Sequence, residues 1–110
     1  MPKGDCYEAA YQFMLSNGHS GKFILVHGYV TGQGDIEGIK YDHAWIEDVN
    51  GDNCYDYSVG RKLKLPRGLY YFVGKIDPKE CYTYTFQETL NKAMDTGVYG
   101  PWDLQTKGGV

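Results

Sequence analysis

Apolar residues near the start of the chain recur with the spacing of an α-helix. Five of them occupy positions i, i+3, i+4, i+7 and i+8, namely Cys6, Ala9, Ala10, Phe13 and Met14. Residues at this spacing lie on one face of a helix, which is the face that packs against a core. Asp5 is a favourable N-cap residue, and Asn17-Gly18 is a typical helix end. We therefore expect the first element to be an amphipathic helix between these two signals.

The hydrophobic pattern then changes to that of β-strands. Residues 23–30 are apolar almost throughout and rich in β-branched side chains, which predicts a largely buried strand. A glycine-rich loop begins at Gly32-Gln33-Gly34 and runs to about Tyr41. Further strands are expected at 43–49, at about 53–57 and at 69–76, with a short extended piece at 63–65 that Pro66 ends. Asn50-Gly51 is a strong signal for a hairpin turn between the first two of these strands.

A second helix is expected near the C-terminus. Thr85 and Glu88 have the spacing of a capping box, and Gly97 is suited to the position just after a helix. The apolar stripe between them consists of Phe86, Leu90, Ala93 and Met94. The predicted order is a helix, four or five mostly antiparallel strands and a helix, which makes an α+β domain with the cysteine-bearing N-terminal helix packed on the sheet. We expect one domain over residues 1–110, with 105–110 forming a disordered tail.

Charge and composition narrow the classes of partner. The net charge is −3, and the chain has no basic stripe of the kind that binds a nucleic-acid backbone. No apolar run approaches the roughly 18 residues of a membrane-spanning helix, and the first residues do not have the pattern of a signal peptide. We therefore expect a cytoplasmic protein that binds neither nucleic acid nor a membrane. Its three cysteines are an odd and sparse set, so free thiols are expected.

Cys6 is the first candidate for chemistry. A thiol reacts as its thiolate, and the dipole and free N–H groups of a helix N-terminus favour that form. The predicted helix places Cys6 in its first turn, which suits a nucleophile. The alternative is a small buried hydrophobic residue on the apolar stripe, because most free cysteines are buried and unreactive. Cys6 alone does not decide between these two interpretations.

A thiol enzyme also needs a base, and the sequence offers three histidines. His43 opens a predicted strand. His27 lies inside the apolar first strand, where a satisfied core histidine or a packing histidine is the more usual role. His19 follows the helix end and is expected to be exposed. His43 is therefore the preferred base.

The predicted hairpin supplies a carboxylate for His43. If Asn50-Gly51 forms a two-residue turn, Val49 pairs with Asp52, and His43 and Asp56 then lie on the same face of the hairpin. They are diagonal neighbours, with backbones roughly 7–8 Å apart, which long side chains can bridge. A slip of one residue would place them on opposite faces. A surface carboxylate is the alternative for Asp56.

In this order the three residues match a known arrangement. A cysteine that opens a helix, His43-Ala44-Trp45 at the start of a strand and Tyr55-Asp56 in the next strand resemble the transglutaminase-like branch of the papain-like superfamily. Arylamine acetyltransferases and bacterial cell-wall peptidases share the helix-borne cysteine followed by a strand-borne histidine. The resemblance covers about residues 4–57 and, more weakly, 69–76, and the compact chain also looks like small phage-encoded proteins. It implies a papain-like core with Cys6 as nucleophile, His43 as base and Asp56 as the residue that orients the ring.

Two functions from different classes follow. The first is a cysteine hydrolase or acyl transferase that acts on a peptide, protein or small acyl substrate through an acyl-enzyme and needs no metal or organic cofactor. Gln33 and Trp45 are the candidates for binding its substrate. The second is a non-catalytic binding protein of the same fold, for example an inhibitor of a host factor, with a protein partner. A zinc site that includes Cys54 is not expected, because the sequence lacks the paired spacing of structural zinc ligands.

Overall fold

A computed structural model describes residues 4–32, 37–57 and 62–105 of the chain. Its elements in order are α1 (Gly4–Asn17), η1 (Gly18–Ser20), β1 (Phe23–Thr31), β2 (Lys40–Asp48), β3 (Asn53–Asp56), β4 (Leu63–Pro66), α2 (Arg67–Gly74), η3 (Pro78–Glu80), β5 (Tyr82–Tyr84) and α3 (Phe86–Thr96). The predicted α+β class is confirmed. Gln33 and residues 106–110 of the predicted tail lie outside the described residues. None of the helices in these ranges is long and apolar enough to cross a bilayer.

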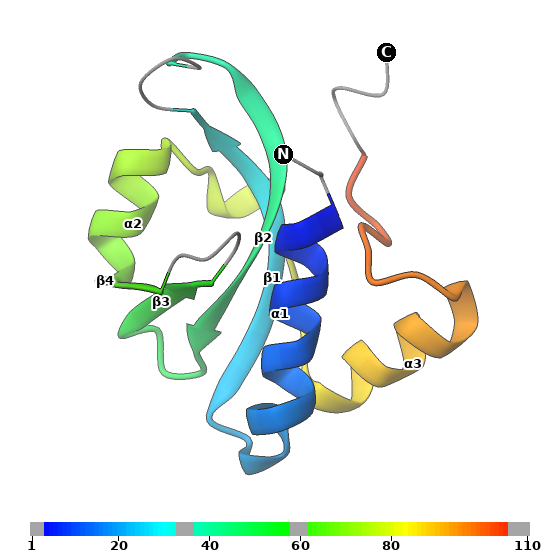
Figure 1. The fold of residues 1–110 in the computed structure, drawn as a ribbon. Helices are drawn as coiled ribbons and strands as arrows, with labels where there is room; N and C mark the ends of the chain where they lie inside the picture. Colours follow the sequence, from blue (N-terminus) through cyan, green and yellow to red (C-terminus); the bar gives the residue numbers. More distant parts are fainter. Residues whose placement is uncertain (1–3, 33–36, 58–61, 106–110) are drawn as a thin grey trace.

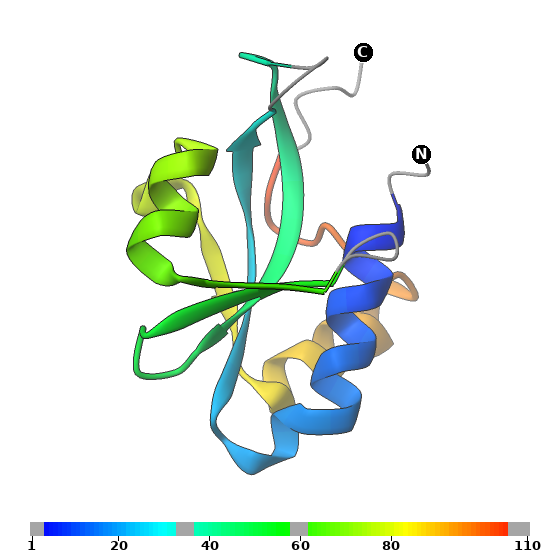
Figure 2. The same cartoon turned by 60° about the vertical axis from the view of Figure 1, so that its left-hand side comes forward.

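The five strands form one antiparallel sheet in the order β4-β3-β2-β1-β5. Its centre is the long hairpin of β1 and β2, which pair from Phe23↔Asp48 to Thr31↔Lys40. Helices α1 and α3 lie on one face of the sheet and α2 lies on the other, as Figures 1 and 2 show from two directions. Covered on both faces, the two central strands bury most of their residues, which explains why residues 23–30 lack a polar alternation.

The two faces carry separate cores. The core on the α1 side consists of Tyr7, Ala10, Met14, Leu25, Ala44, Ile46 and Tyr84. The core on the α2 side consists of Val26, Val30, Trp45, Cys54, Tyr70 and Ile76. Because successive strand residues point to opposite faces, Ala44 and Ile46 of β2 face α1, whereas Trp45 between them faces α2. The same alternation directs Asp42 toward α1 and His43 toward α2.

The predicted register of the β2–β3 hairpin is confirmed. Ile46 pairs with Tyr55 and Glu47 with Cys54, which are the pairs that the Asn50-Gly51 turn predicts. The connection itself is longer than predicted, because β2 ends at Asp48 and β3 begins at Asn53. Within it the Gly51 N–H donates to the Asp48 carbonyl over 2.9 Å, and Gly51 has a φ of 84° that favours glycine. Extending the loop at both ends together leaves every pair of opposite residues unchanged.

The predicted strand at 69–76 is wrong. Arg67–Gly74 forms helix α2, which follows β4 directly after Pro66. The run Tyr70-Tyr71-Phe72-Val73 favours a strand by intrinsic propensity, but tertiary contacts override such preferences. Here Tyr70 is the one buried residue of α2, while Phe72 is 81% exposed. A short helix with one buried side accommodates this mixture of buried and exposed aromatic residues. The fifth strand of the sheet is instead β5, whose three residues are too few to show a strand pattern in the sequence.

The helix ends test the capping predictions. At α3 both hydrogen bonds of the capping box form, since Thr85 Oγ1 accepts from the Glu88 N–H and the Glu88 side chain accepts from the Thr85 N–H. Gly97 follows in the left-handed conformation at φ 73°. At α1 the helix begins at Gly4, so Asp5 lies in the first turn and is not the N-cap as predicted. Cys6 stays in the first turn.

Candidate thiol site

Cys6, His43 and Asp56 come together from three elements. Cys6 lies in the first turn of α1, His43 is on β2 and Asp56 is the last residue of β3. His43 Nε2 lies 2.8 Å from Asp56 Oδ2, and both side chains are buried. The Cys6 thiol lies close enough to the His43 ring to interact with it, and this interaction contributes to a raised His43 pKa. Because Nε2 is engaged by Asp56, Nδ1 is the ring nitrogen that remains for the thiol.

A buried hydrogen bond holds the start of α1 against β2 at this point. The Tyr7 hydroxyl donates to Asp42 Oδ2 over 2.7 Å. Tyr7 follows Cys6 on the helix, and Asp42 precedes His43 on the strand. The bond therefore fixes the helix start beside the strand residue that carries the imidazole. His43 also lies beyond the last β2–β3 pair, Ile46↔Tyr55, at the end of β3 where α1 approaches.

A second tyrosine contacts the Asp56 carboxylate, from the face of the sheet that Asp56 and His43 share. Tyr70 of α2 donates its hydroxyl proton to Asp56 Oδ2 over 3.0 Å. The same oxygen therefore binds both His43 Nε2 and Tyr70 Oη. The sequence did not indicate Tyr70, because its segment has the propensity of a strand, and it did not indicate Tyr7. A signal for a partner such as Tyr7 was available, because the alternation of β2 places Asp42 on the buried face and a buried carboxylate requires a hydrogen-bond donor.

The electrostatics of the site favour a protonated imidazole. Burial by itself would lower the His43 pKa, but the hydrogen bond to Asp56, the interaction with Cys6 and the Asp56 charge raise it to about 9. The other two thiols, Cys54 and Cys81, are in surroundings that disfavour ionisation. Burial raises the pKa of Cys54 and, to about 11, that of Cys81, and the neighbouring Glu47 carboxylate adds to both increases.

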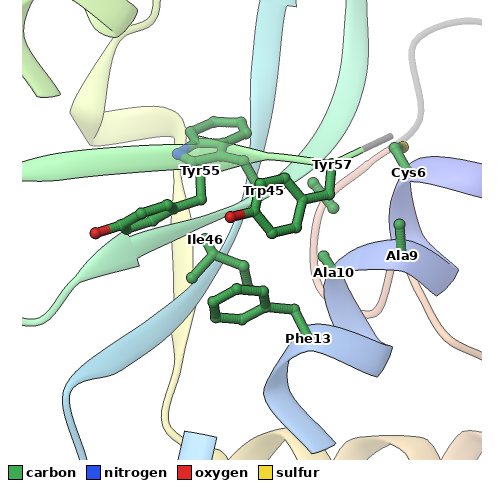
Figure 3. A pocket seen from close by; sticks show the side chains of 9 residues that line it. Cys6, Ala9, Ala10, Phe13, Trp45, Ile46, Tyr55 and Tyr57 are labelled. Atoms are coloured by element: carbon green, nitrogen blue, oxygen red, sulfur yellow. The ribbon is translucent and has the colours of Figure 1, made fainter. Parts of the chain in front are cut away.

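A narrow cavity lies beside Cys6, between α1 and the β2–β3 hairpin. Its lining is mostly apolar or aromatic and consists of Cys6, Ala9, Ala10, Phe13, Ala44, Trp45, Ile46, Tyr55 and Tyr57. Figure 3 shows the α1 residues along one wall and the two tyrosines opposite them. About 10 Å³ is open to water, which is the room of about one water molecule. The cavity in this form admits water and not an acyl group.

The remaining predicted residues have other surroundings. Trp45 is 1% exposed, and its indole N–H donates to Glu47 Oε2 over 2.9 Å. Its role in substrate binding stays a prediction, as does that of Gln33. His19 is exposed, as expected.

His27 is fully buried among Tyr7, Tyr84 and Trp102, but within the described ranges neither ring nitrogen has a hydrogen-bond partner. Of the two predicted roles, a satisfied core histidine or a packing histidine, the structure shows the packing histidine.

Among the described residues, no three His, Cys, Asp or Glu side chains are grouped so that they could hold a metal ion. No protein-family model, no curated protein and no solved structure matches the chain.

Proposed function

We propose that the protein is a thiol-dependent hydrolase or acyl transferase that forms an acyl-enzyme at Cys6. The observation that carries this proposal is the continuous chain of contacts from the Cys6 thiol through the His43 ring to the Asp56 carboxylate. A nucleophile, a base and a group that orients the base are the three parts of this kind of catalysis. Membership of the papain-like superfamily, in its transglutaminase-like branch, is part of the same proposal.

Each residue has one role in the proposed reaction. The Cys6 thiol first passes its proton to His43 Nδ1, which leaves a thiolate beside a charged imidazole, and the thiolate then attacks the carbonyl carbon of an amide, ester or thioester. His43 then returns a proton to the leaving group as the tetrahedral intermediate collapses to the thioester acyl-enzyme. Asp56 holds the ring through Nε2 and stabilises its positive charge. Water or an amine resolves the acyl-enzyme, giving hydrolysis or acyl transfer.

The charge state of His43 supports this assignment. With its pKa raised to about 9, the imidazole carries a proton at neutral pH. A positively charged ring in contact with a thiol stabilises the thiolate, which is the nucleophilic form. Cys81, whose pKa is raised to about 11, is ionised to roughly one part in ten thousand at pH 7. The chain thus contains its own unreactive reference thiols.

Brief treatment with dilute iodoacetamide at pH 7, followed by mass spectrometry of the peptides, tests the proposal. We expect Cys6 to be alkylated at least about tenfold faster than Cys54 and Cys81. His43→Ala removes the imidazole, so it should reduce Cys6 alkylation in the folded protein. Equal rates at all three thiols, or faster labelling of Cys54 or Cys81, would count against a thiol enzyme.

A non-catalytic binding protein is the second candidate, and the burial of the site favours it. His43 is 8% and Asp56 6% exposed, and the cavity beside Cys6 has the room of about one water. A buried, hydrogen-bonded pair of this kind also stabilises a fold without any chemistry. Thermal unfolding of His43→Ala separates the two candidates when it is measured together with Cys6 labelling. A large fall in melting temperature with unchanged Cys6 reactivity supports the binding protein.

A further inference from the structure

The two neighbouring tyrosines of α2 bind different carboxylates. Tyr70 donates to Asp56, which faces His43, whereas Tyr71 donates to Glu47. Glu47 also accepts from Arg67 Nε over 3.0 Å and from the Trp45 indole. The guanidinium of Arg67 lies 4.2 Å from the centre of the Tyr71 ring. Tyr71 therefore belongs to a cluster that attaches α2 to the sheet, while Tyr70 belongs to the chain that leads to Cys6.

Tyr70 is held firmly in the position from which it reaches Asp56. It is buried, and its ring packs against the Trp45 ring at 5.4 Å between centroids. The attachment of Arg67 and Tyr71 to Glu47 fixes the first turns of α2 on both sides of Tyr70. Burial and the Asp56 charge raise the pKa of Tyr70 well above its usual value, so its hydroxyl remains protonated at any working pH. It is consequently a permanent, neutral donor.

We propose that Tyr70 is a positioning residue of the thiol site, which orients the Asp56 carboxylate and divides its charge between two donors, so that His43 receives only part of it. This inference rests on the proposed function of the Cys6 site. The geometric basis is that Asp56 Oδ2 binds both His43 Nε2 at 2.8 Å and Tyr70 Oη at 3.0 Å. A donor on a carboxylate oxygen withdraws charge from it and weakens its hold on a second donor.

The surroundings of the His43 ring define what can move its titration. Among the described residues, the ionisable groups that act on it directly or pack against it are Cys6 from α1, Asp56 from β3 and Tyr41 on β2, whose ring lies 5.8 Å away. Tyr70 acts on it through Asp56. Removing the Tyr70 hydroxyl leaves more of the Asp56 charge to His43, so the His43 proton is held more tightly. The midpoint of its titration should then rise.

NMR titration of the His43 ring protons tests this inference in the intact chain. In Tyr70→Phe we expect the midpoint to move to higher pH by about one pH unit. Tyr71→Phe is the matched control. It also removes a tyrosine hydroxyl from α2, but this hydroxyl binds Glu47, a carboxylate that does not bind His43. The His43 midpoint should be unchanged in that control. Equal midpoints in the two variants would overturn the inference, whatever their melting temperatures.

A second substitution should shift the His43 midpoint in the opposite direction while it keeps the shape of the side chain. 3-Fluorotyrosine incorporated at position 70 is a stronger donor than tyrosine, so it should move the His43 midpoint to lower pH than in the unmodified protein. An unchanged or higher midpoint would contradict the inference even if Tyr70→Phe failed to fold. These shifts are measured without reference to Cys6 alkylation. An unreactive Cys6 therefore rejects the enzyme, whereas unshifted midpoints reject the role of Tyr70 alone.

Discussion

The two central strands each bury a histidine, and the two rings have opposite surroundings. His43 on β2 faces α2, hydrogen-bonds Asp56 and interacts with the Cys6 thiol, and its pKa is raised to about 9. His27 on β1 faces α1 and packs against aromatic rings, and its nitrogens have no hydrogen-bond partner among the described residues; its pKa is lowered to about 3, mainly by burial. The neighbouring strands thus hold one charged and one neutral imidazole at pH 7.

The difference shows that partners, and not burial, decide what a buried histidine can do. Burial acts on both rings in the same direction, because it disfavours the charged form. At His43 a carboxylate in direct contact outweighs burial. At His27 the nearest charges, Asp103 and Asp42, raise the pKa too little to offset it. A ring that can exchange its proton with a thiol suits chemistry, and a neutral ring packed between tyrosines and a tryptophan suits a core.

The largest expected effect is an alkaline loss of stability that belongs to His43. Its folded pKa of about 9 lies above the ordinary 6.5, so the folded state binds more protons between these values. Its contribution is complete below pH 6.5 and is lost as the pH rises through 9, by up to about 3 kcal/mol. Urea unfolding at a series of pH values measures this. In His43→Gln the alkaline slope should disappear, and a slope that persists would assign it to another group.

His27 should produce a loss of stability at acid pH, opposite in direction to the alkaline loss from His43. Its folded pKa of about 3 lies below 6.5, so the unfolded state binds the extra proton. Stability is therefore lost as the pH falls below 6.5, by about 2–3 kcal/mol at pH 4.5. The same urea series on His27→Leu should show a shallower acid slope, while the alkaline slope of His43 stays. If the acid slope were equal in both proteins, His27 would have a partner that neutralises its charge.

The surroundings of His43 could be predicted from the sequence better than those of His27, and the reason is physical. The two-residue period of a strand and the Asn50-Gly51 signal were sufficient to place His43 and Asp56 on one face. The period cannot reveal contacts from distant segments. Tyr70 was missed because α2 is formed in spite of its strand-favouring residues, with Arg67 and Tyr71 bound to Glu47 twenty or more positions earlier. The aromatic packing around His27 comes from Tyr7, Tyr84 and Trp102, which no local pattern connects.

Asp56→Asn should lower the reactivity of Cys6 by acting on His43, and should leave His27 unaffected. It removes the charge that raises the His43 pKa, and an amide can donate to Nε2 and so favour the wrong tautomer. We expect Cys6 alkylation at pH 7 to fall more than about tenfold. Because the pair is buried and not in a partly open cleft, the unfolding free energy should also fall, by about 1–3 kcal/mol. Unaltered alkylation with that loss of stability would make Asp56 a structural partner.

The smallest expected effect comes from Tyr7, which touches both histidine environments. Its ring packs edge-on against His27 at 4.9 Å, and its hydroxyl holds Asp42 next to His43. Tyr7→Phe keeps the ring and removes the hydroxyl, so the helix start that carries Cys6 is held less closely to β2. Cys6 alkylation should fall by a few-fold, about 1 kcal/mol in activation free energy, with the acid slope of His27 retained.

Tyr84→Phe is the matched control for that change. Tyr84 also packs on His27, at 5.0 Å between centroids, and its hydroxyl donates to a carboxylate, but that carboxylate is Asp103 and not the strand residue beside His43. Its alkylation rate at Cys6 should equal that of the unmodified protein. If both variants slow alkylation equally, the effect comes from general loosening around His27, and Tyr7 has no separate part in bringing Cys6 to His43. A lower rate in Tyr7→Phe alone means that the bond to Asp42 joins the two halves of the thiol site.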